Sequence, residues 1–444
     1  MSTTASSRRA WRSQLAFCTA DPFHEPTAEA FHFISDGVVV CENGRFAAVG
    51  EAERILPTLG DEIPIEHYPD HIIIPGMVDA HVHYPQHGII GAYSGELLEW
   101  LEQVAFPAEA AFADRAHADS VAEGFLEGLL TNGTTTALVF ATVHEASVEA
   151  FFTAAARRGL RMICGKVLMD RNAPAALLDT ADSGDRQSRA LIERWHGHDR
   201  LGYAVTPRFA LTSSSAQLSS AGRLLEAYPD VLLHTHLCEN PHEIRAVKGE
   251  FPHCEDYLGV YEAHGLVGSR SVFAHSIHLS EREQACLGEH DAAVAFCPMS
   301  NFALGSGLFD LDAARQHRLR VALGSDVGAG NSLSLLRCLD EAYKTCKLRG
   351  QRLEPAHALY LATLGGARAL GLERQIGSLE VGKEADFVVL DPLATPDQRS
   401  RNVPPRDASE RLFTIFSLGD DRCVAQTIAA GRVAHRRTAE AIPS

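Results

Sequence analysis

The chain has 444 residues, of which 45% are hydrophobic and 22% charged, a composition typical of folded globular proteins and unlike that of disordered or fibrous ones. Its 40 lysine and arginine residues are outnumbered by 57 aspartate and glutamate residues, which gives a formal net charge of −17 at pH 7. A surface with this charge repels a phosphate backbone, so nucleic acid is excluded as a partner.

The beginning of the chain and its cysteines indicate a cytoplasmic protein. No run of 18 apolar residues is long enough for a membrane helix, and the first 20 residues lack the apolar core of a signal peptide. The ten cysteines form no Cys-x-x-Cys pair, which predicts reduced thiols. Residues 1–14 are rich in Ser and Arg, and we expect a disordered N-terminus there; an organelle transit peptide is the alternative.

Both ends of the chain show short β-strand patterns. Residues 37–50 contain two apolar runs around Asn43-Gly44, a dipeptide that favours a tight hairpin turn. Residues 385–391 and 424–436 are also rich in β-branched residues. These patterns predict a small β-sandwich domain built from residues 15–70 together with residues 376–444.

The central region, residues 71–375, alternates between apolar runs and segments of helical periodicity. The eight expected strands fall at 71–83, 134–142, 161–170, 201–210, 231–239, 271–279, 292–301 and 321–330. Such alternation is typical of parallel strands joined by helices, and eight units over this length predict an α/β fold of the (β/α)8 TIM-barrel type. An open, doubly wound sheet is the alternative.

Polar residues gather at the predicted carboxyl ends of four of these strands, where a parallel barrel places its active site. The first strand ends in His81-Val-His83, whose imidazoles share one face because side chains alternate along a strand. The other three ends carry further histidines and acidic residues, namely His234, His236 and Glu239, then His275 and His278, and finally Asp326.

Three imidazoles with one carboxylate form a set suited to zinc or ferrous iron. A bound cation lowers the pKa of water towards neutrality, and Asp326 can then accept the proton. Glu239, near the same strand end but not needed as a ligand, can protonate a departing nitrogen. The residues therefore predict metal-dependent hydrolysis of a carbon–nitrogen bond.

These motifs resemble the metal-dependent amidohydrolase superfamily, and the finer ones resemble the guanine deaminases within it. The superfamily framework consists of the histidine motifs and Gly-Ser-Asp326, whereas HYPQ at 83–86, LLEW at 97–100 and TPRF at 206–209 are specific to the guanine deaminases. The resemblance covers roughly residues 35–435. It implies hydrolysis of guanine to xanthine and ammonia, one zinc ion per chain, and a homodimer.

The resemblance also implies a role for each candidate residue. It makes His81, His83, His236 and Asp326 the metal ligands. Catalysis falls to Glu239 as proton shuttle, Asp326 as base and His275 beside the metal and its water. Gln86 and Arg208 hydrogen-bond the purine and Phe209 stacks on it, while His236, Glu239 and Asp326 also face it.

Five other residues are expected to lie outside the reacting set. Lys166 suggests the bridging lysine of two-metal relatives, but those relatives carry it on the fourth strand, where this chain reads TPRF. His234 is expected to be a buried structural residue, and His87, His144 and His278 to be loop or supporting residues. Two alternatives stay open for the function: a deaminase or dechlorinase acting on another amino-substituted heterocycle, and a non-catalytic scaffold.

Overall fold

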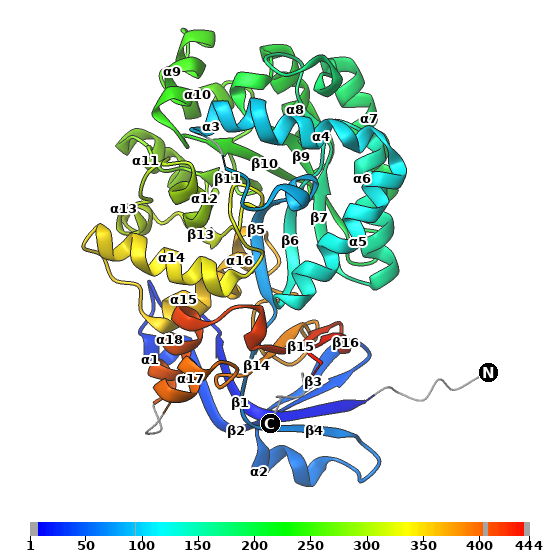
Figure 1. Cartoon of the computed structure of the whole chain (residues 1–444), viewed down its shortest axis with the longest axis vertical. Coiled ribbons are helices and arrows are strands. Elements are labelled where there is room, and N and C mark those ends of the chain that lie inside the picture. Colours follow the sequence, from blue (N-terminus) through cyan, green and yellow to red (C-terminus); the bar gives the residue numbers. More distant parts are fainter. Residues whose placement is uncertain (1–7, 94, 403–406, 439–444) are drawn as a thin grey trace, which may run out of the picture.

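The computed structural model describes residues 8–93, 95–402 and 407–438, and divides them between a barrel and a second, smaller sheet (Figure 1). No helix among these residues is long and apolar enough to cross a membrane.

Eight parallel strands form the nearly closed barrel that the sequence predicts, so the open sheet is excluded. In order around the barrel they are β5 (Met77–His83), β6 (Thr134–Phe140), β7 (Arg161–Gly165), β9 (Gly202–Pro207), β10 (Leu232–Leu237), β11 (Ser271–His275), β12 (Ala293–Phe296) and β13 (Arg320–Leu323). The short β8 (Val167–Leu168) adds a second pairing to β9.

The chain just after β13 joins this last strand to the first one. The Asp326 N–H donates to the carbonyl of His81 at 2.9 Å, and the His83 N–H donates to the carbonyl of Val327 at 2.9 Å. Gly324 permits this approach, because a Cβ there would lie 2.8 Å from the Sγ of Cys297 and from the Cβ of His81. Backbone hydrogen bonds therefore close the ring directly at three of the predicted site residues.

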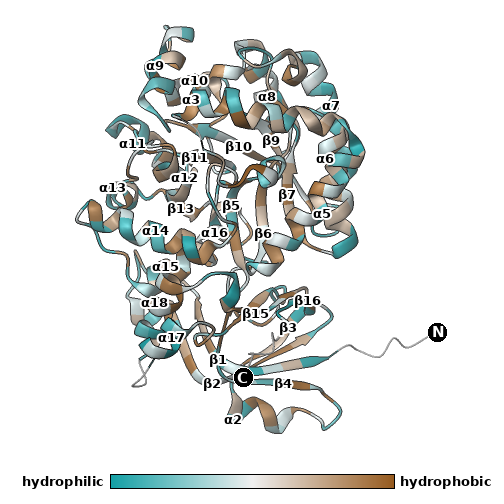
Figure 2. Ribbon diagram, viewed as in Figure 1, coloured by the Kyte–Doolittle hydropathy of each residue, from teal (hydrophilic) through white to brown (hydrophobic). Residues whose placement is uncertain are grey.

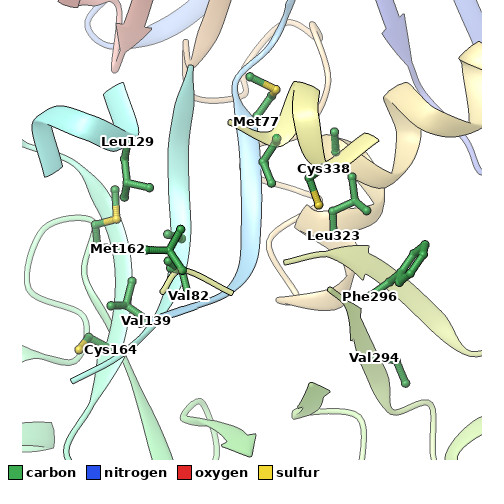
Figure 3. Close-up of a cluster of buried hydrophobic side chains, with 14 of the residues drawn as sticks. Met77, Val82, Leu129, Val139, Met162, Cys164, Val294, Phe296, Leu323 and Cys338 are labelled. Carbon is green, nitrogen blue, oxygen red and sulfur yellow. The ribbon is translucent and has the colours of Figure 1, made fainter. Parts of the chain in front are cut away.

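Helices cover the outside of the barrel and bury a large apolar layer against the strands. The main ones are α5 (Arg115–Thr131), α6 (Glu145–Arg158), α7 (Ala181–Trp195), α8 (Ser215–Ala227), α9 (Pro241–Glu250), α10 (Tyr257–Glu262), α11 (Glu281–Glu289), α12 (Pro298–Ala303), α13 (Leu311–Gln316) and α14 (Leu335–Leu348). Val82, Val139 and Met162 come from three neighbouring strands and belong to one core cluster with Leu129 of α5 (Figure 3).

Strands and covering helices differ in hydropathy. Figure 2 shows the contrast between β7, whose residues are mostly hydrophobic, and α7, which contains many hydrophilic residues.

The lower interior of the barrel is filled by small side chains, including Ala80, Ala204 and Ala293. Ala367 of α16 (Leu364–Ala369) belongs to the same cluster and closes the barrel from below, next to α15 (Pro355–Ala362). This apolar packing fills the barrel interior below the site, and the cavity with the predicted site residues lies at the carboxyl end of the strands.

The second sheet has seven strands drawn from both ends of the chain, as the terminal strand patterns predict. Their order is β16 (Arg432–Arg436), β15 (Val424–Ala429), β14 (Phe387–Leu390), β4 (Ile65–Pro75), β1 (Arg9–Cys18), β2 (Phe31–Glu42) and β3 (Arg45–Glu51). The helices α17 (Pro396–Arg401) and α18 (Ala408–Leu418) lie between β14 and β15 in the chain.

This sheet curls upon itself around a core that includes Trp11 and Phe387, whose rings meet edge to face. Phe46 of β3 donates its N–H to the carbonyl of Lys383, just before β14, at 2.9 Å. Asn43 and Gly44 both have positive φ, 51° and 79°, which is the backbone that the predicted β2–β3 hairpin requires. The expected sandwich is thus one curled sheet.

Two expected boundaries are wrong. Residues 9–14, expected to be disordered, belong to β1, because Ala10, Trp11 and Ser13 are buried and Arg9–Ser13 pair with Gly37–Cys41 of β2. Residues 1–7 lie outside the described residues. The passage from the small sheet to the barrel falls at Gly76 and not at residue 71, since residues 71–75 are the apolar end of β4.

A buried ionic cluster joins the small sheet to the amino-terminal end of the barrel. Arg161 and Arg200 donate their Nε–H groups to Oε2 of Glu384 at 2.8 and 2.9 Å, and Arg200 also pairs with Asp386. Burial alone favours a higher pKa for Glu384, but the two guanidinium groups outweigh it and lower that pKa below its ordinary value. The two parts of the molecule are therefore held together by charge as well as by apolar packing.

The chain after β5 crosses over the carboxyl end of the barrel. It forms a 3-10 helix, η2 (Tyr84–Ile89), and later α3 (Leu97–Trp100), a π-helical turn η3 (Leu101–Ala105) and α4 (Phe106–Ala110). We call residues 95–110 the covering segment. Leu97, Trp100 and Leu101 from this segment line the cavity described next.

Candidate active site

The predicted site residues meet in one cavity at the carboxyl end of the barrel. It is lined by residues from six barrel strands and the segments that follow them and by the covering segment: His83, Gln86, Leu97, Trp100, Leu101, Arg208, Phe209, His236, Glu239, Glu243, His275, Leu304, Asp326 and Ala329. His81 lies directly behind it, fully buried. Every residue predicted to bind metal, act in catalysis or contact substrate is therefore at or beside this cavity.

Four imidazoles and one carboxylate surround a common point. His81, His83 and His236 offer ligand atoms within 4.8 Å of one another, as do His81, His275 and Asp326. Oδ1 of Asp326 lies 3.2 Å from Nε2 of His81 and 3.4 Å from Nε2 of His83. This spacing is suited to a single cation shared by the group.

Hydrogen bonds at the far nitrogen turn the imidazole lone pairs into the cavity. Nδ1 of His236 donates to the carbonyl of Arg208 at 2.7 Å, and Nδ1 of His275 donates to Oδ1 of Asn301 at 3.0 Å. Because these oxygens can only accept, the proton stays on Nδ1 and Nε2 keeps its lone pair.

His81 is oriented by a second histidine. Its Nδ1 lies 2.7 Å from Nε2 of His234, and its own Nε2 is buried without a hydrogen bond. Burial lowers the pKa of His81, His83 and His236 well below the ordinary range, and the neighbouring imidazoles lower it further. Neutral imidazoles with a buried, unbonded nitrogen fit a bound metal ion.

Glu239 stands beside this group without belonging to it. Its Oε2 lies 3.4 Å from Nε2 of His275, and its Oε1 accepts a hydrogen bond from Oγ of Ser306 at 3.1 Å. Burial raises the pKa of Glu239 to about 7, against the opposing effect of His275. A carboxyl group with a pKa near neutrality can both accept and donate a proton at physiological pH.

The pKa of His275 moves in the opposite direction to that of the other site imidazoles. Burial acts to lower it, but the carboxylates of Glu239 and Asp326 outweigh burial and raise it above the ordinary value. Oδ2 of Asp326 lies 3.7 Å from Nε2 of His275. The three residues form one coupled acid–base group.

Backbone conformation at the strand ends is unusual around the site. Cys238, His275, Ser276 and Asp326 all have positive φ, between 47° and 66°. Side chains other than glycine rarely adopt this region, so the surrounding contacts must hold them there. The turns bring Glu239, His275 and Asp326 towards the barrel axis directly after β10, β11 and β13.

The opposite side of the cavity holds hydrogen-bond donors. Arg208 and Phe209 follow β9, and Gln86 lies on η2. The Arg208 side chain is 3% exposed and its Nη1 donates to both oxygens of Glu109, at 2.9 and 2.7 Å. Gln86 donates its Nε2–H to Glu109 at 2.8 Å and accepts at Oε1 from the N–H of Gly328 at 3.0 Å.

Three buried carboxylates at or near the site were not predicted from the sequence. Glu243 lines the cavity and accepts a hydrogen bond from the Glu239 N–H at 2.9 Å. Glu109 ends the motif LLEWLEQVAFPAE, and an acidic residue among apolar ones is the signal that could have drawn attention to it. Asp79 accepts hydrogen bonds from the N–H groups of His81 and Ser325, at 3.2 and 3.0 Å, and so links β5 to the chain after β13. Burial raises the pKa of Asp79 to about 7, which these bonds oppose.

The residues that the sequence analysis expects outside the reacting set do not line the cavity. His234 is the one of them that contacts a proposed metal ligand, His81. Lys166 pairs with Asp179 outside the cavity. His278 contacts the carbonyl of Ser306 through Nε2 at 2.7 Å. His87 and His144 are not among the residues that line the cavity.

Comparisons with known proteins agree with this geometry. The model of the amidohydrolase family matches residues 72–434. The guanine deaminase of Escherichia coli K12 is 49% identical over 413 residues, which cover 93% of this chain and 94% of that protein. The probable guanine deaminase of Deinococcus radiodurans is 42% identical over 438 residues, covering 97% and 99% of the two chains.

Solved structures that resemble this chain are also guanine deaminases. The E. coli guanine deaminase structure superposes with a TM-score of 0.93 at 46% identity and covers 97% of this chain and 99% of its own. The guanine deaminase of C. acetobutylicum, solved with guanine in its active site, has a TM-score of 0.87 at 29% identity and covers 96% and 99%.

Proposed function

The chain belongs to the amidohydrolase family, and from that premise we propose that it hydrolyses guanine to xanthine and ammonia. The observation that carries the proposal is the composition of one buried cavity, which has a His/Asp group suited to a metal on one side and the donors of Arg208 and Gln86 on the other. A planar purine placed between them presents its C2 amino group to the first and its carbonyl to the second.

We propose that His81, His83, His236 and Asp326 hold one zinc ion per chain, with ferrous iron as the alternative. Support comes from the neutral imidazoles, the buried Nε2 of His81 and the carboxylate between His81 and His83. When bound, such a cation lowers the pKa of a water molecule so that hydroxide is available at neutral pH.

Two carboxylates of the chain transfer the protons in this reaction. Asp326 accepts the proton of the attacking water, and its Oδ2 lies close enough to His275 for the imidazole to stabilise the charge. Glu239, with a pKa of about 7, protonates the ring nitrogen beside C2, takes up the remaining proton of the added hydroxyl and passes it to the leaving amine. The proton held by Asp326 then restores the acid form of Glu239 for the next turnover. Water supplies the oxygen of the new carbonyl, and the amino group leaves as ammonia.

Recognition depends on donors that face the purine carbonyl. Arg208 makes no hydrogen bond through Nε or Nη2 to any other described residue, so these donors are available to O6 of guanine. The second N–H of the Gln86 amide is available in the same way. Phe209 lies at the cavity wall as a stacking surface.

A product assay with metal analysis tests the proposal. Purified protein is loaded with zinc or with iron, its metal content is measured, and ammonia release is followed with guanine, adenine, cytosine, an aminopterin and an aminotriazine. We expect xanthine from guanine with about one zinc per chain. Faster release from a pterin or triazine would favour the alternative heterocyclic substrates, and a folded, zinc-loaded protein inactive on all five would favour a scaffold.

Two further properties are proposals: a homodimer, from the family resemblance, and a cytoplasmic location, from the sequence pattern. Analytical ultracentrifugation of the full chain tests the first, and fractionation of the source cells tests the second.

A further inference from the structure

Glu109 is the carboxylate that contacts both recognition residues of the cavity. It lies on α4 in the covering segment and its side chain is 0% exposed. Its oxygens accept from Nη1 of Arg208 and from Nε2 of Gln86, two side chains that reach it from β9 and η2. We propose that Glu109 is the positioning residue that fixes the donor pattern by which this enzyme selects 6-oxopurines, an inference that rests on the proposed function.

The contact with Arg208 determines which of its donors remain free. Both oxygens of Glu109 bind the same nitrogen, Nη1, so the carboxylate sits at one corner of the guanidinium plane. The plane also lies against the ring of Phe106, whose centroid is 5.3 Å from Cζ. Glu109 thus fixes Nη1, and Phe106 covers one face of the guanidinium. The remaining donors, Nε and Nη2, lie on the edge that faces the cavity.

The contact with Gln86 determines which way its amide points. The Gly328 N–H donates to Oε1, and Glu109 accepts from Nε2, so the two ends of the amide have partners of opposite type. Turning the amide over would place N–H against N–H and oxygen against carboxylate. Glu109 thus keeps a donor of Gln86 facing the cavity.

Charge explains why this position carries a carboxylate. A buried guanidinium without a counter-ion is strongly unfavourable, whereas the Arg208–Glu109 pair is neutral as a whole. An amide in place of Glu109 retains one acceptor oxygen but removes the charge and one of the two bonds to Nη1. Substrate affinity should therefore fall while the metal group, across the cavity, is unaffected.

The test uses Glu109→Gln, with Glu102→Gln as the matched control. Glu102 is an exposed carboxylate on the same covering segment, so its substitution makes the same chemical change without touching Arg208. We expect Glu109→Gln to raise KM for guanine by about 10- to 100-fold, the usual effect of losing a charged hydrogen bond, with kcat changed by less than about 5-fold. Metal content should stay that of the wild type.

A binding measurement separates this inference from the proposed function. Hypoxanthine has the same O6 carbonyl as guanine but no amino group at C2, so it binds without being deaminated. Its Kd, measured by calorimetry, should rise in Glu109→Gln by the same factor as KM. If the wild type releases no ammonia from guanine, the proposed function fails; if the wild type is active and Glu109→Gln binds hypoxanthine as the wild type does, the inference fails.

A double-mutant cycle with Arg208→Met tests whether Glu109 acts through its partner. In the Arg208→Met background, Glu109→Gln should raise the Kd for hypoxanthine by a clearly smaller factor than in the wild type, because the contact with Arg208 is already lost and only the contact with Gln86 remains. The double variant also removes both buried charges, so it is expected to fold even where a single variant is unstable. Effects that multiply in the double variant would overturn the inference.

Discussion

Glu239 and Asp326 flank His275 at similar distances but differ in what else they contact. Asp326 also approaches His81 and His83, whereas the side-chain hydrogen bond that Glu239 accepts among the described residues comes from Ser306. This difference agrees with the proposal that Asp326 holds the metal and Glu239 carries a proton.

Glu239→Gln is expected to lower kcat for guanine by about 10²- to 10⁴-fold, the usual contribution of general acid–base catalysis. The amide keeps the shape and a hydrogen bond to Ser306, so metal content and hypoxanthine binding should change little. Steady-state kinetics and metal analysis check this, with the exposed Glu255→Gln as control. A kcat within 5-fold of the wild type would remove Glu239 from the mechanism.

Arg208→Met is expected to impair guanine turnover while the metal stays bound. Adenine carries an amino group where guanine has O6, so it would place donor against donor at Arg208, and it has no amino group at C2. We expect the wild type to prefer guanine by about 10⁴-fold in kcat/KM.

Ammonia release from both purines measures this preference, and the exposed Arg245→Met serves as control. Equal rates with adenine and guanine would contradict the assignment of this side of the cavity.

The sequence is informative about residues that follow a strand directly. His81, His83, His236, His275 and Asp326 could be placed together because parallel strands end at one edge of the barrel. Glu109 could not be placed in this way. Its position depends on how the covering segment, an irregular run with a π-helical turn, crosses the barrel, and no periodicity specifies that path.

At the scale of secondary-structure elements, the junction between the small sheet and the barrel depends on a few buried charges. Glu384 accepts from Arg161 and Arg200 at once, and the side chains of both arginines are only 14% exposed. Removing one member of such a cluster leaves the others buried without compensation.

Glu384→Gln is expected to lower the free energy of unfolding by about 3–5 kcal/mol at neutral pH. Because the pKa of Glu384 is lowered in the folded protein, the stabilisation is fully present above its unfolded value of roughly 4.3 and is lost as pH falls through the folded value. The difference from the wild type should therefore shrink in acid.

Urea unfolding from pH 7 down to about pH 2.5, below the folded pKa of Glu384, measures this difference, with the exposed Glu53→Gln as control. A pH-independent difference would show that the charge of Glu384 is not what matters.

Element boundaries were harder to predict than element types. The run HIIIPGMVDAHVH reads as one strand, but it divides at Gly76 into the end of β4 and the start of β5. The dipeptide Pro75-Gly76 is a local signal for this break. A Cβ at Gly76 would lie 2.1 Å from Oγ1 of Thr135, and this close approach of a residue distant in the sequence is not contained in the local pattern.

For the molecule as a whole, the metal should add stability without being required for the fold. The barrel ring is already closed by the backbone bonds between His81, His83 and the chain after β13. Metal that binds only the folded state adds about 4 kcal/mol at a free concentration a thousand times its Kd.

Chelation of the wild type should lower Tm with retention of the circular dichroism spectrum, and added zinc should restore it. His83→Ala, which lacks one proposed ligand, should be inactive and show no such recovery. Recovery equal to that of the wild type would contradict the proposed ligand set.

Because the small sheet is built from both ends of the chain, the ribosome synthesises the whole barrel before this sheet can be completed. Strand β4 pairs on one side with β1, which precedes it, but on the other side with β14, which lies roughly 310 residues later. At ordinary elongation rates the nascent chain carries the apolar edge Ile72–Ile73–Ile74 without its partner for roughly 15 to 60 s. During that interval the whole barrel is made and can fold, while the open edge can pair with another nascent chain. Yield of native protein should therefore depend on translation speed and on chaperones that shield this strand.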